Sequence, residues 1–260
     1  MRHFRLSALI HSLAGLTLSS LFCLPAIAAE CTASSGPNRV ALLELYTSEG
    51  CSSCPSADRW LSSIAANPDR VVPLALHVDY WDYIGWKDRF AKPAFSARQR
   101  EMAGLSRSGF VYTPQMMLNG RDFRSGYSSA RFEEQLKAIN RTAPQAKIKL
   151  SVNQTADSVQ LSTTGQAARQ SNPVLYVALY ENGLTSEVKA GENSGARLHH
   201  DYVVREWLGP YPIDDNSTTP WQQKIGLKPD WKTKNMGAAA FVQNRSTGEV
   251  LQAVALKFCS

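Results

Sequence analysis

The sequence has few cysteines, no concentrated charge and, beyond its first 29 residues, no long hydrophobic run. Lys and Arg are scattered and form neither a run nor a basic stripe, so we expect no nucleic-acid partner. No later segment approaches the roughly twenty apolar residues that a membrane-spanning helix needs. Gly-rich phosphate loops, a Walker motif and a Gly-x-Ser-x-Gly elbow are also absent, so nothing indicates nucleotide binding or a serine nucleophile.

Residues 1–29 have the pattern of a secretory signal peptide. Arg2 and Arg5 precede an apolar stretch from Leu6 to Leu24, and the small residues up to Ala29 form an Ala-x-Ala cleavage site. A membrane anchor is the alternative, which is disfavoured because the apolar stretch is short and contains His11. We therefore expect a periplasmic or secreted protein that has no membrane association after cleavage.

Four of the five cysteines remain after removal of the signal peptide, which contains Cys23. Cys31, Cys51, Cys54 and Cys259 would enter an oxidising compartment, where an even number suggests two disulfides. The natural pairing of the three possible ones is Cys51–Cys54 with Cys31–Cys259, because it joins the close pair and the two ends of the mature chain. The second bridge would be structural and worth on the order of 4–5 kcal/mol in the chain-entropy model.

The pair Cys51 and Cys54 lies where an apolar run ends and an amphipathic segment begins. A thiol reacts as the thiolate, and the positive end of a helix dipole stabilises a thiolate. Cys51 would be the exposed attacking sulfur, and Cys54, one helical turn later, would resolve the mixed disulfide. The pattern predicts a thiol–disulfide oxidoreductase that acts on protein or peptide thiols and disulfides, together with a redox partner protein.

The first half of the mature chain has the pattern of an α/β domain. Apolar runs at residues 40–46 and 71–80 predict parallel strands, and the helical spacing from Pro55 to about Ala66 predicts the crossover helix between them. This unit places the dithiol at the carboxyl end of a strand. A helical insertion around residues 93–105, a strand with a hairpin at 110–120 and a helix ending at Asn140 would follow.

Past Pro144 the pattern changes to strict alternation of apolar and polar residues. Strands are expected around residues 147–152, 159–161, 174–180, 203–205, 238–243 and 250–258. Several short strands separated by turns predict a β-sandwich-like domain. The long segment 184–208 lies between strands, and loops of this length in compact domains are either functional or disordered. Its high density of polar residues motivates the hypothesis that it packs near the dithiol.

The order of strand, Cys-x-x-Cys helix, strand, helical insertion, Thr-Pro, hairpin and helix resembles the thioredoxin fold. The resemblance implies that Pro114 is a cis proline beside the dithiol and that Thr113 offers backbone groups to an extended substrate. Glu44 lies where thioredoxins often keep a buried acid, which could take the proton from Cys54. The alternative for Glu44 is a residue in solvent or in a salt bridge.

Four segments more narrowly resemble a bacterial family of secreted thioredoxin-like proteins catalogued as domain-of-unknown-function family 1223. They are Leu43 to Pro55, His77 to Asp82, Tyr112 to Gln115, and Gly191 to Asn193 followed by His200 to Arg205. The expected fold is an α/β thioredoxin-like domain with a helical insertion over residues 30–142. A mainly antiparallel, sandwich-like β domain would follow over residues 143–260.

Two other functions are consistent with the dithiol. The first is a noncatalytic binding or adaptor protein in which Cys51–Cys54 is a buried structural bridge, whereas a catalytic pair should have one exposed sulfur of low pKa. The second is a copper site made by Cys51 and Cys54 with His77 and Met116, for which the spacing gives no positive support. Zinc would need two further ligands that the sequence does not pair with the dithiol. We predict no cofactor and no metal, interpret His77 as a core histidine and interpret Glu49 as a solvated loop residue.

Overall fold

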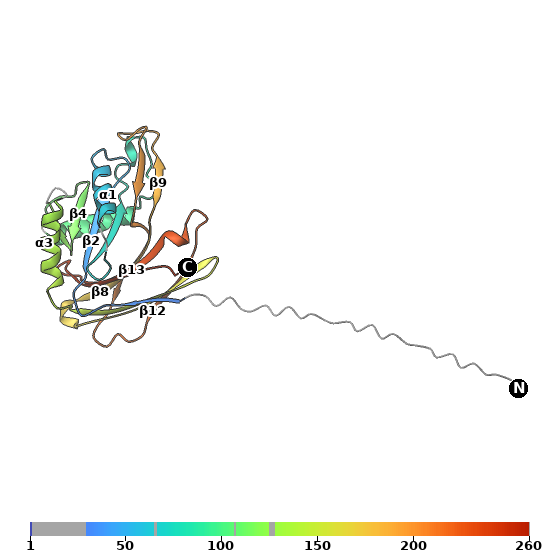
Figure 1. Cartoon of the computed structure of the whole chain (residues 1–260). Coiled ribbons are helices and arrows are strands. Elements are labelled where there is room, and N and C mark those ends of the chain that lie inside the picture. Colours follow the sequence, from blue (N-terminus) through green and yellow to red (C-terminus); the bar gives the residue numbers. More distant parts are fainter. Residues whose placement is uncertain (2–29, 65–66, 107, 125–127, 260) are drawn as a thin grey trace.

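The computed structural model describes Met1 and residues 30–64, 67–106, 108–124 and 128–259 (Figure 1). Apart from Met1, the predicted signal peptide lies outside the described residues. Among the described helices, none is long and apolar enough to cross a membrane.

The described part of the chain contains three α-helices and fourteen strands. The helices are α1 (Cys54–Ser63), α2 (Pro93–Leu105) and α3 (Ser129–Asn140), and the short 3-10 helices are η1 (Asp82–Ile84), η2 (Arg169–Ser171) and η3 (Thr233–Asn235). The strands before α3 are β1 (Glu30–Ser34), β2 (Ala41–Thr47), β3 (Val71–His77), β4 (Gln115–Leu118) and β5 (Arg121–Asp122). The strands after α3 are β6 (Ala146–Gln154), β7 (Ser158–Ala167), β8 (Pro173–Glu181), β9 (Leu184–Glu187), β10 (Arg197–His200), β11 (Val203–Pro212), β12 (Trp221–Gly226), β13 (Met236–Asn244) and β14 (Val250–Lys257).

Eight strands form one continuous sheet in the order β14-β13-β8-β11-β3-β2-β4-β5. Strands β2 and β3 run parallel, with Thr47 opposite His77, and β11 joins β3 in parallel where Val203 lies opposite Ala75. Every residue of β2 and β3 is buried, as expected for strands that are covered on both faces. The carboxyl ends of β2 and β3 therefore meet at one edge of a well-packed sheet.

The two faces of β2 pack against different helices. Leu43 and Leu45 belong to the hydrophobic cluster that contains the buried residues of α1 and α3, whereas Leu42 and Tyr46 belong to the cluster that contains α2. Side chains alternate along a strand, so α1 and α3 cover one face of the sheet and α2 covers the other. Helix α3 begins after Ser128, whose side chain accepts a hydrogen bond from the Arg131 N–H and caps the helix.

A second sheet of four strands has the order β1-β6-β7-β12. Its apolar side chains, among them Leu150 and Leu161, pack against Leu175 and Val177 of β8 in one cluster. The disulfide Cys31–Cys259 links β1 to the segment after β14, with a Cα–Cα distance of 5.7 Å. The predicted structural bridge is therefore present, and it joins chain segments that are 228 residues apart.

The predicted fold class, a thioredoxin-like α/β domain followed by a separate β-sandwich, is wrong. The fold is mostly β, with strands far outnumbering the three helices in the described residues. Strands β8, β11, β13 and β14 do not pair only among themselves, because β11 hydrogen-bonds to β3 and extends the first half's sheet. The local pattern at residues 203–205 predicts a strand but does not show that it pairs with β3, since periodicity shows which strands exist but not which strands they pair with.

Most individual elements were predicted correctly. Helix α2 has the expected bounds, α3 ends at Asn140, and strands lie at each of the six expected positions of the second half. The sequence interpretation missed β1, β12 and the hairpin of β9 and β10, which lies within the segment interpreted as a long loop. Figure 1 shows β9 at the same end of the molecule as α1, and its partner β10 contacts α1.

Candidate dithiol site

The dithiol lies in the tight connection between β2 and α1. Cys51 and Cys54 form a disulfide with a Cα–Cα distance of 5.4 Å. The connection is held by backbone hydrogen bonds from the Cys51 N–H to the Ser48 carbonyl and from the Cys54 N–H to the Cys51 carbonyl. Gly50 is tightly packed, because a Cβ there would lie 3.0 Å from the Cβ of Trp81. The predicted pairing of the two close cysteines at a helix start is confirmed.

Both sulfur-bearing residues are buried. Cys51 is 1% exposed and Cys54 is 0% exposed, so the exposed attacking sulfur that we expected is not found. The Cys51 Sγ lies 3.4 Å from the Ser53 hydroxyl oxygen. The segment after β3 covers the dithiol on one side, where Trp81 packs on Gly50. The other side is covered by the turn between β9 and β10.

The β9–β10 turn is fastened to the dithiol loop by three hydrogen bonds. The Asn193 side-chain amide donates to the carbonyl oxygens of Glu49 at 2.8 Å and Cys51 at 3.0 Å. The Glu192 carboxylate accepts a hydrogen bond of 3.0 Å from the Ser52 N–H, which is one of the unpaired donors before the first turn of α1. The hypothesis that residues 184–208 pack near the dithiol is confirmed.

Buried ionisable side chains lie next to the dithiol loop. The Nε2 atom of His200, at the end of β10, lies 3.4 Å from Glu49 Oε1, and its Nδ1 atom lies 3.3 Å from Asp58 Oδ2. Glu49 also accepts a hydrogen bond of 2.7 Å from the Trp86 indole. His200, Glu49 and Asp58 are each at most 5% exposed. The interpretation of Glu49 as a solvated loop residue is therefore wrong, because η1 and the β9–β10 hairpin close over it.

A second pair of ionisable residues adjoins the first. His77 Nδ1 lies 2.7 Å from Asp88 Oδ2, and the same oxygen accepts a hydrogen bond from the Glu49 N–H. The rings of His77 and His200 are in edge-on contact, with their centroids 4.9 Å apart. His77 is thus a core histidine with a partner, as predicted. We call Glu49, Asp58, His77, Asp88 and His200 the buried charge cluster.

The pKa values of the cluster follow from burial and from these contacts. Burial lowers the pKa of His200, but contacts with the Asp58 and Glu49 carboxylates outweigh burial and raise the pKa to about 10. Burial raises the pKa of Glu49, but contacts with His200, Ser186 and Trp86 lower it below its usual value. Burial likewise opposes ionisation of Asp88, and His77 lowers the pKa of Asp88 overall. His200 therefore carries a positive charge at neutral pH.

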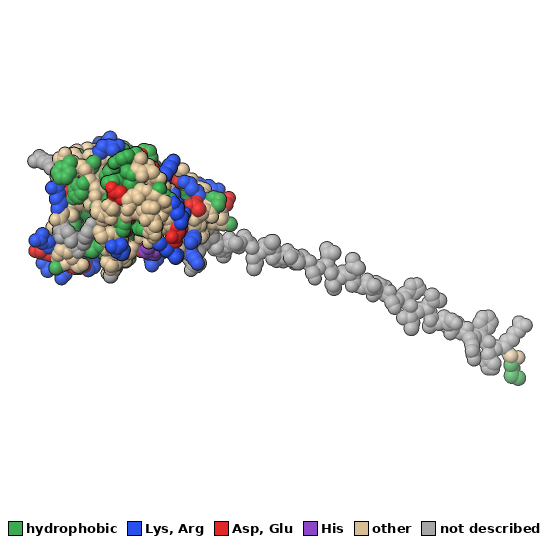
Figure 2. All heavy atoms as spheres, turned by 90° about the horizontal axis from the view of Figure 1, so that it is seen from above, with side chains coloured by type: hydrophobic (Ala, Val, Ile, Leu, Met, Phe, Trp, Pro, Cys, Tyr) green, Lys and Arg blue, Asp and Glu red, His purple; other side chains and the backbone are tan. Residues whose placement is uncertain are grey.

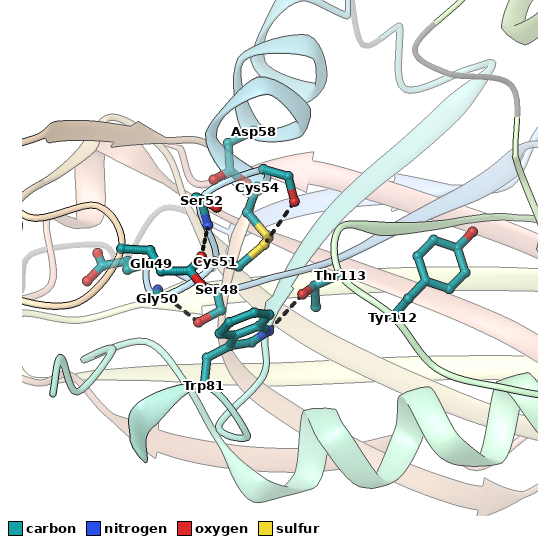
Figure 3. Close-up of a disulfide and its surroundings, with 12 residues drawn as sticks. Ser48, Glu49, Gly50, Cys51, Ser52, Cys54, Asp58, Trp81, Tyr112 and Thr113 are labelled. Carbon is teal, nitrogen blue, oxygen red and sulfur yellow. Dashed lines mark hydrogen bonds between the residues drawn. A yellow bond between two sulfur atoms is a disulfide. The ribbon is translucent and has the colours of Figure 1, made fainter. Parts of the chain in front are cut away.

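Thr113 and Pro114 lie next to Trp81, which also contacts the dithiol loop. The peptide bond between Thr113 and Pro114 is cis, as the resemblance implied. The Trp81 indole N–H donates a hydrogen bond of 2.7 Å to the Thr113 hydroxyl, and Trp81 also packs on Gly50. Figure 3 shows Trp81 next to both the dithiol loop and Thr113, with the Tyr112 ring directed away from the sulfurs. One tryptophan therefore links the dithiol loop to the Thr113–Pro114 segment.

Glu44 lies on the face of β2 that is opposite to α1. Its Oε1 atom pairs with Arg98 Nε of α2 at 2.6 Å and accepts a hydrogen bond from the Tyr46 hydroxyl. Both partners of the ion pair are almost fully buried. The structure therefore does not bring Glu44 to Cys54, and its side chain has the salt-bridge environment that was the alternative interpretation.

The sequence interpretation missed the two residues that contact each other behind the dithiol, Asp58 and His200. Asp58 follows Cys54 by four positions, so helical spacing alone places both on one side of α1. His200 had no comparable signal, because its proximity depends on the pairing of β10 with β9 and on the docking of that hairpin. In the described residues, no group of three or more His, Cys, Asp or Glu side chains is arranged to hold a metal ion.

Fold and site together define a mostly β protein that has two large sheets and one two-stranded sheet in the described residues, with a buried Cys-x-x-Cys disulfide at the start of a helix. The chain belongs to the family described as "Protein of unknown function (DUF1223)", whose family model matches residues 42–243. The family resemblance expected from four sequence segments is thus confirmed, whereas no match supports the thioredoxin-like superfamily.

Solved structures give the same fold. The chain is similar to protein AGR_C_4864 from Agrobacterium tumefaciens, with 28% identity and a TM-score of 0.63 over 85% of this chain and 96% of that one. It is also similar to HBP35 of Porphyromonas gingivalis, with 15% identity and a TM-score of 0.65 over 86% of this chain and 76% of that one. No curated protein matches the chain.

Proposed function

We propose that this protein is an exported thiol–disulfide oxidoreductase in which Cys51 and Cys54 exchange disulfides with protein or peptide thiols. The observation that carries the proposal is the position of the disulfide, which closes a loop of four residues at the start of α1 beside buried ionisable groups. A helix start favours the thiolate form of a cysteine. Ionisable side chains nearby can exchange the protons that accompany disulfide reduction.

The two disulfides differ in what they can contribute to stability. In the chain-entropy model, a four-residue loop such as Cys51–Cys54 stabilises the fold by only about 2 kcal/mol, whereas closing a loop of over 200 residues, as Cys31–Cys259 does, contributes about 5 kcal/mol. The small loop contributes little as a structural bridge. This difference favours a redox role for Cys51–Cys54 and a structural role for Cys31–Cys259.

The surroundings of the dithiol support a polypeptide as the substrate. The segment at Thr113 and Pro114 adjoins the dithiol through Trp81 and lies before β4, next to the sheet edge formed by β5. We propose that Thr113 presents its backbone groups to an extended substrate there. Lys and Arg side chains are dispersed over the face shown in Figure 2 rather than gathered in one cluster, which does not favour a nucleic-acid partner.

One observation favours a second function. Because Cys51 is 1% exposed, the pair also fits a noncatalytic binding protein in which the bridge only holds the loop between β2 and α1. The two functions differ in whether the bridge is reduced under physiological redox conditions.

A redox titration of the mature protein in glutathione buffers decides between the two functions. The Cys31→Ser/Cys259→Ser double variant serves as the protein in which Cys51–Cys54 is the remaining bridge. A potential between about −120 and −270 mV, with a mixed disulfide trapped in the Cys54→Ser variant, supports the oxidoreductase. A potential below about −300 mV and no trapped mixed disulfide would instead identify a structural bridge.

A further inference from the structure

The three carboxylates of the buried charge cluster are not equally satisfied. Asp88 accepts hydrogen bonds from His77 and from the Glu49 and Phe90 N–H groups. Glu49 accepts one from Trp86. Within the described residues, Asp58 has only its 3.3 Å ion pair with His200, and its Oδ2 atom, like Oε1 of Glu49, is buried without a hydrogen bond of good geometry. Asp58 therefore has fewer hydrogen bonds than Glu49 or Asp88, and its buried oxygen can accept a proton.

Asp58 is also next to the dithiol. It follows Cys54 by one helical turn, and side chains at this spacing have Cβ atoms about 5–6 Å apart. Both residues are on the buried side of α1. Figure 3 shows Asp58 beside Cys54 at the start of the helix. Asp58 therefore lies one helical turn from the cysteine that would resolve a mixed disulfide.

His200 determines the charge around Asp58. The titratable groups that face His200 are Asp58 from α1, Glu49 from the loop after β2 and, at the edge of the His200 ring, His77 with its partner Asp88. The His200 imidazolium lies between the Glu49 and Asp58 carboxylates, so His200, Glu49 and Asp58 together carry a net charge of −1. A proton on Asp58 would neutralise them, and neutrality is favoured in a buried environment.

We propose that Asp58 accepts the proton of Cys54 when the Cys54 sulfur attacks a mixed disulfide at Cys51, and that His200 is the positioning residue that holds the Asp58 carboxylate for this transfer. The proposal rests on the proposed function. It assigns the proton-accepting role to a carboxylate on α1 and a histidine on β10, in place of Glu44, which lies on the opposite face of β2.

The reaction has two steps that balance. The Cys51 thiolate attacks a substrate disulfide, so that a bond from Cys51 to one substrate sulfur forms, the substrate disulfide breaks and the first substrate thiolate leaves. Cys54 then gives its proton to Asp58, and its sulfur bonds to Cys51 while the second substrate thiolate leaves. Two cysteines are oxidised and one substrate disulfide is reduced to two thiols. The proton passes from Asp58 to the departing thiolate or to solvent.

The test measures the two steps separately in the reduced full-length mature protein. Oxidised glutathione is the probe, and acid quenching with mass spectrometry follows the formation and the decay of the glutathione adduct at Cys51. In Asp58→Asn we expect formation to keep the wild-type rate and decay to slow about a hundredfold at neutral pH, the lower range for loss of a general base. His200→Gln should slow decay less, because the carboxylate remains.

The pH profile gives a readout that a purely structural role would not change. In a thiol with a pKa of about 8.5 and no general base, the thiolate fraction rises about tenfold per pH unit below the pKa. The rate of adduct decay in Asp58→Asn should therefore rise about tenfold per pH unit between pH 6 and 8. Decay in the wild-type protein should be nearly flat over the same range. The wild-type profile alone decides the question if Asp58→Asn does not fold, since a tenfold rise per pH unit there would overturn the proposal.

The matched control is His199→Gln, which changes the neighbouring histidine whose side chain is 54% exposed and pairs with Asp201. This variant should keep both rates of the wild-type protein. Formation of the adduct followed by wild-type decay in Asp58→Asn would overturn the role of Asp58 and leave the oxidoreductase in place. Failure of every variant and of the wild-type protein to form an adduct would overturn the oxidoreductase itself and this proposal with it.

Discussion

Asn193 donates a hydrogen bond of 3.0 Å from its side-chain amide to the backbone carbonyl of Cys51. The same amide donates to the Glu49 carbonyl at 2.8 Å. One side chain from the β9–β10 turn thus holds both ends of the segment that leads into the disulfide. Because Cys51 is buried and the turn is bonded to its carbonyl, we expect that the turn moves away when a substrate sulfur reaches Cys51.

We expect Asn193→Ala to make the disulfide easier to attack. The substitution removes two hydrogen bonds of the turn, each worth about 0.5–1.5 kcal/mol, so opening of the turn should become at least about fivefold more frequent. The rate of Cys51–Cys54 reduction by tris(2-carboxyethyl)phosphine, followed by alkylation and mass spectrometry, should rise by the same factor.

The control for this prediction lies on the same turn. Ser194 donates a hydrogen bond from its hydroxyl to the Lys189 carbonyl and, among the described residues, makes no hydrogen bond to the dithiol loop, so Ser194→Ala should leave the reduction rate unchanged. An equal rate in wild-type protein and in Asn193→Ala would show that the turn does not limit access to Cys51.

The ion pair of Arg98 with Glu44 should be a major determinant of stability. Arg98 Nε lies 2.6 Å from Glu44 Oε1, and both side chains are at most 3% exposed. The guanidinium also lies over the rings of Tyr176, Trp207 and Phe241. Arg98→Met leaves the Glu44 carboxylate buried without its cation, and we expect the free energy of unfolding to fall by about 3–5 kcal/mol. Urea unfolding followed by circular dichroism measures this loss.

Two further variants separate the buried charge from the loss of packing. Glu44→Gln combined with Arg98→Met should recover much of the loss, because no unpaired charge remains. Arg70→Met breaks the half-exposed pair of Arg70 with Glu133 and should cost at most about 1 kcal/mol. A loss in Arg98→Met as small as that in Arg70→Met would contradict the prediction.

Local signals in the sequence identified the dithiol, and long-range pairing determined its surroundings. Cys51, Cys54 and the start of α1 follow from a motif and from helical periodicity within a dozen residues, and Cys31–Cys259 follows from the even number of cysteines. His200 could not be predicted in the same way, because it is almost 150 residues from Cys51 in the chain and depends on the docking of a hairpin that was interpreted as a loop. Glu49 was misinterpreted for the same reason.

The predicted fold class was wrong because one strand pairing, that of β11 with β3, was not predicted. Residues 203–205 were expected to form a strand, and they do, but nothing local shows that Val203 pairs in parallel with Ala75. That pairing joins β8, β13 and β14 to the sheet that carries the dithiol. Strand order depends on contacts between distant segments, which hydrophobic periodicity in one sequence does not contain.

The charge on His200 should make stability fall with rising pH. The pKa of His200 is raised from 6.5 to about 10 in the folded state. The stabilisation by His200 is therefore fully present below the pKa of the unfolded state and is lost as the pH rises through the pKa of the folded state. Between these values the unfolded state has released a proton that the folded state still binds. The free energy of unfolding should therefore fall by about 1.4 kcal/mol per pH unit through this group.

Urea unfolding between about pH 7 and 9.5 tests this prediction, since this range lies between the two pKa values of the group. The decline with pH should be steeper in the wild-type protein than in His200→Gln, and the difference between the two slopes is the contribution of His200. His199→Gln is the control, and it should keep the wild-type slope because His199 is half exposed. Equal slopes in the wild-type protein and in His200→Gln would mean that His200 is neutral in the folded state, and Asp58 and Glu49 would then share a buried site without a compensating cation.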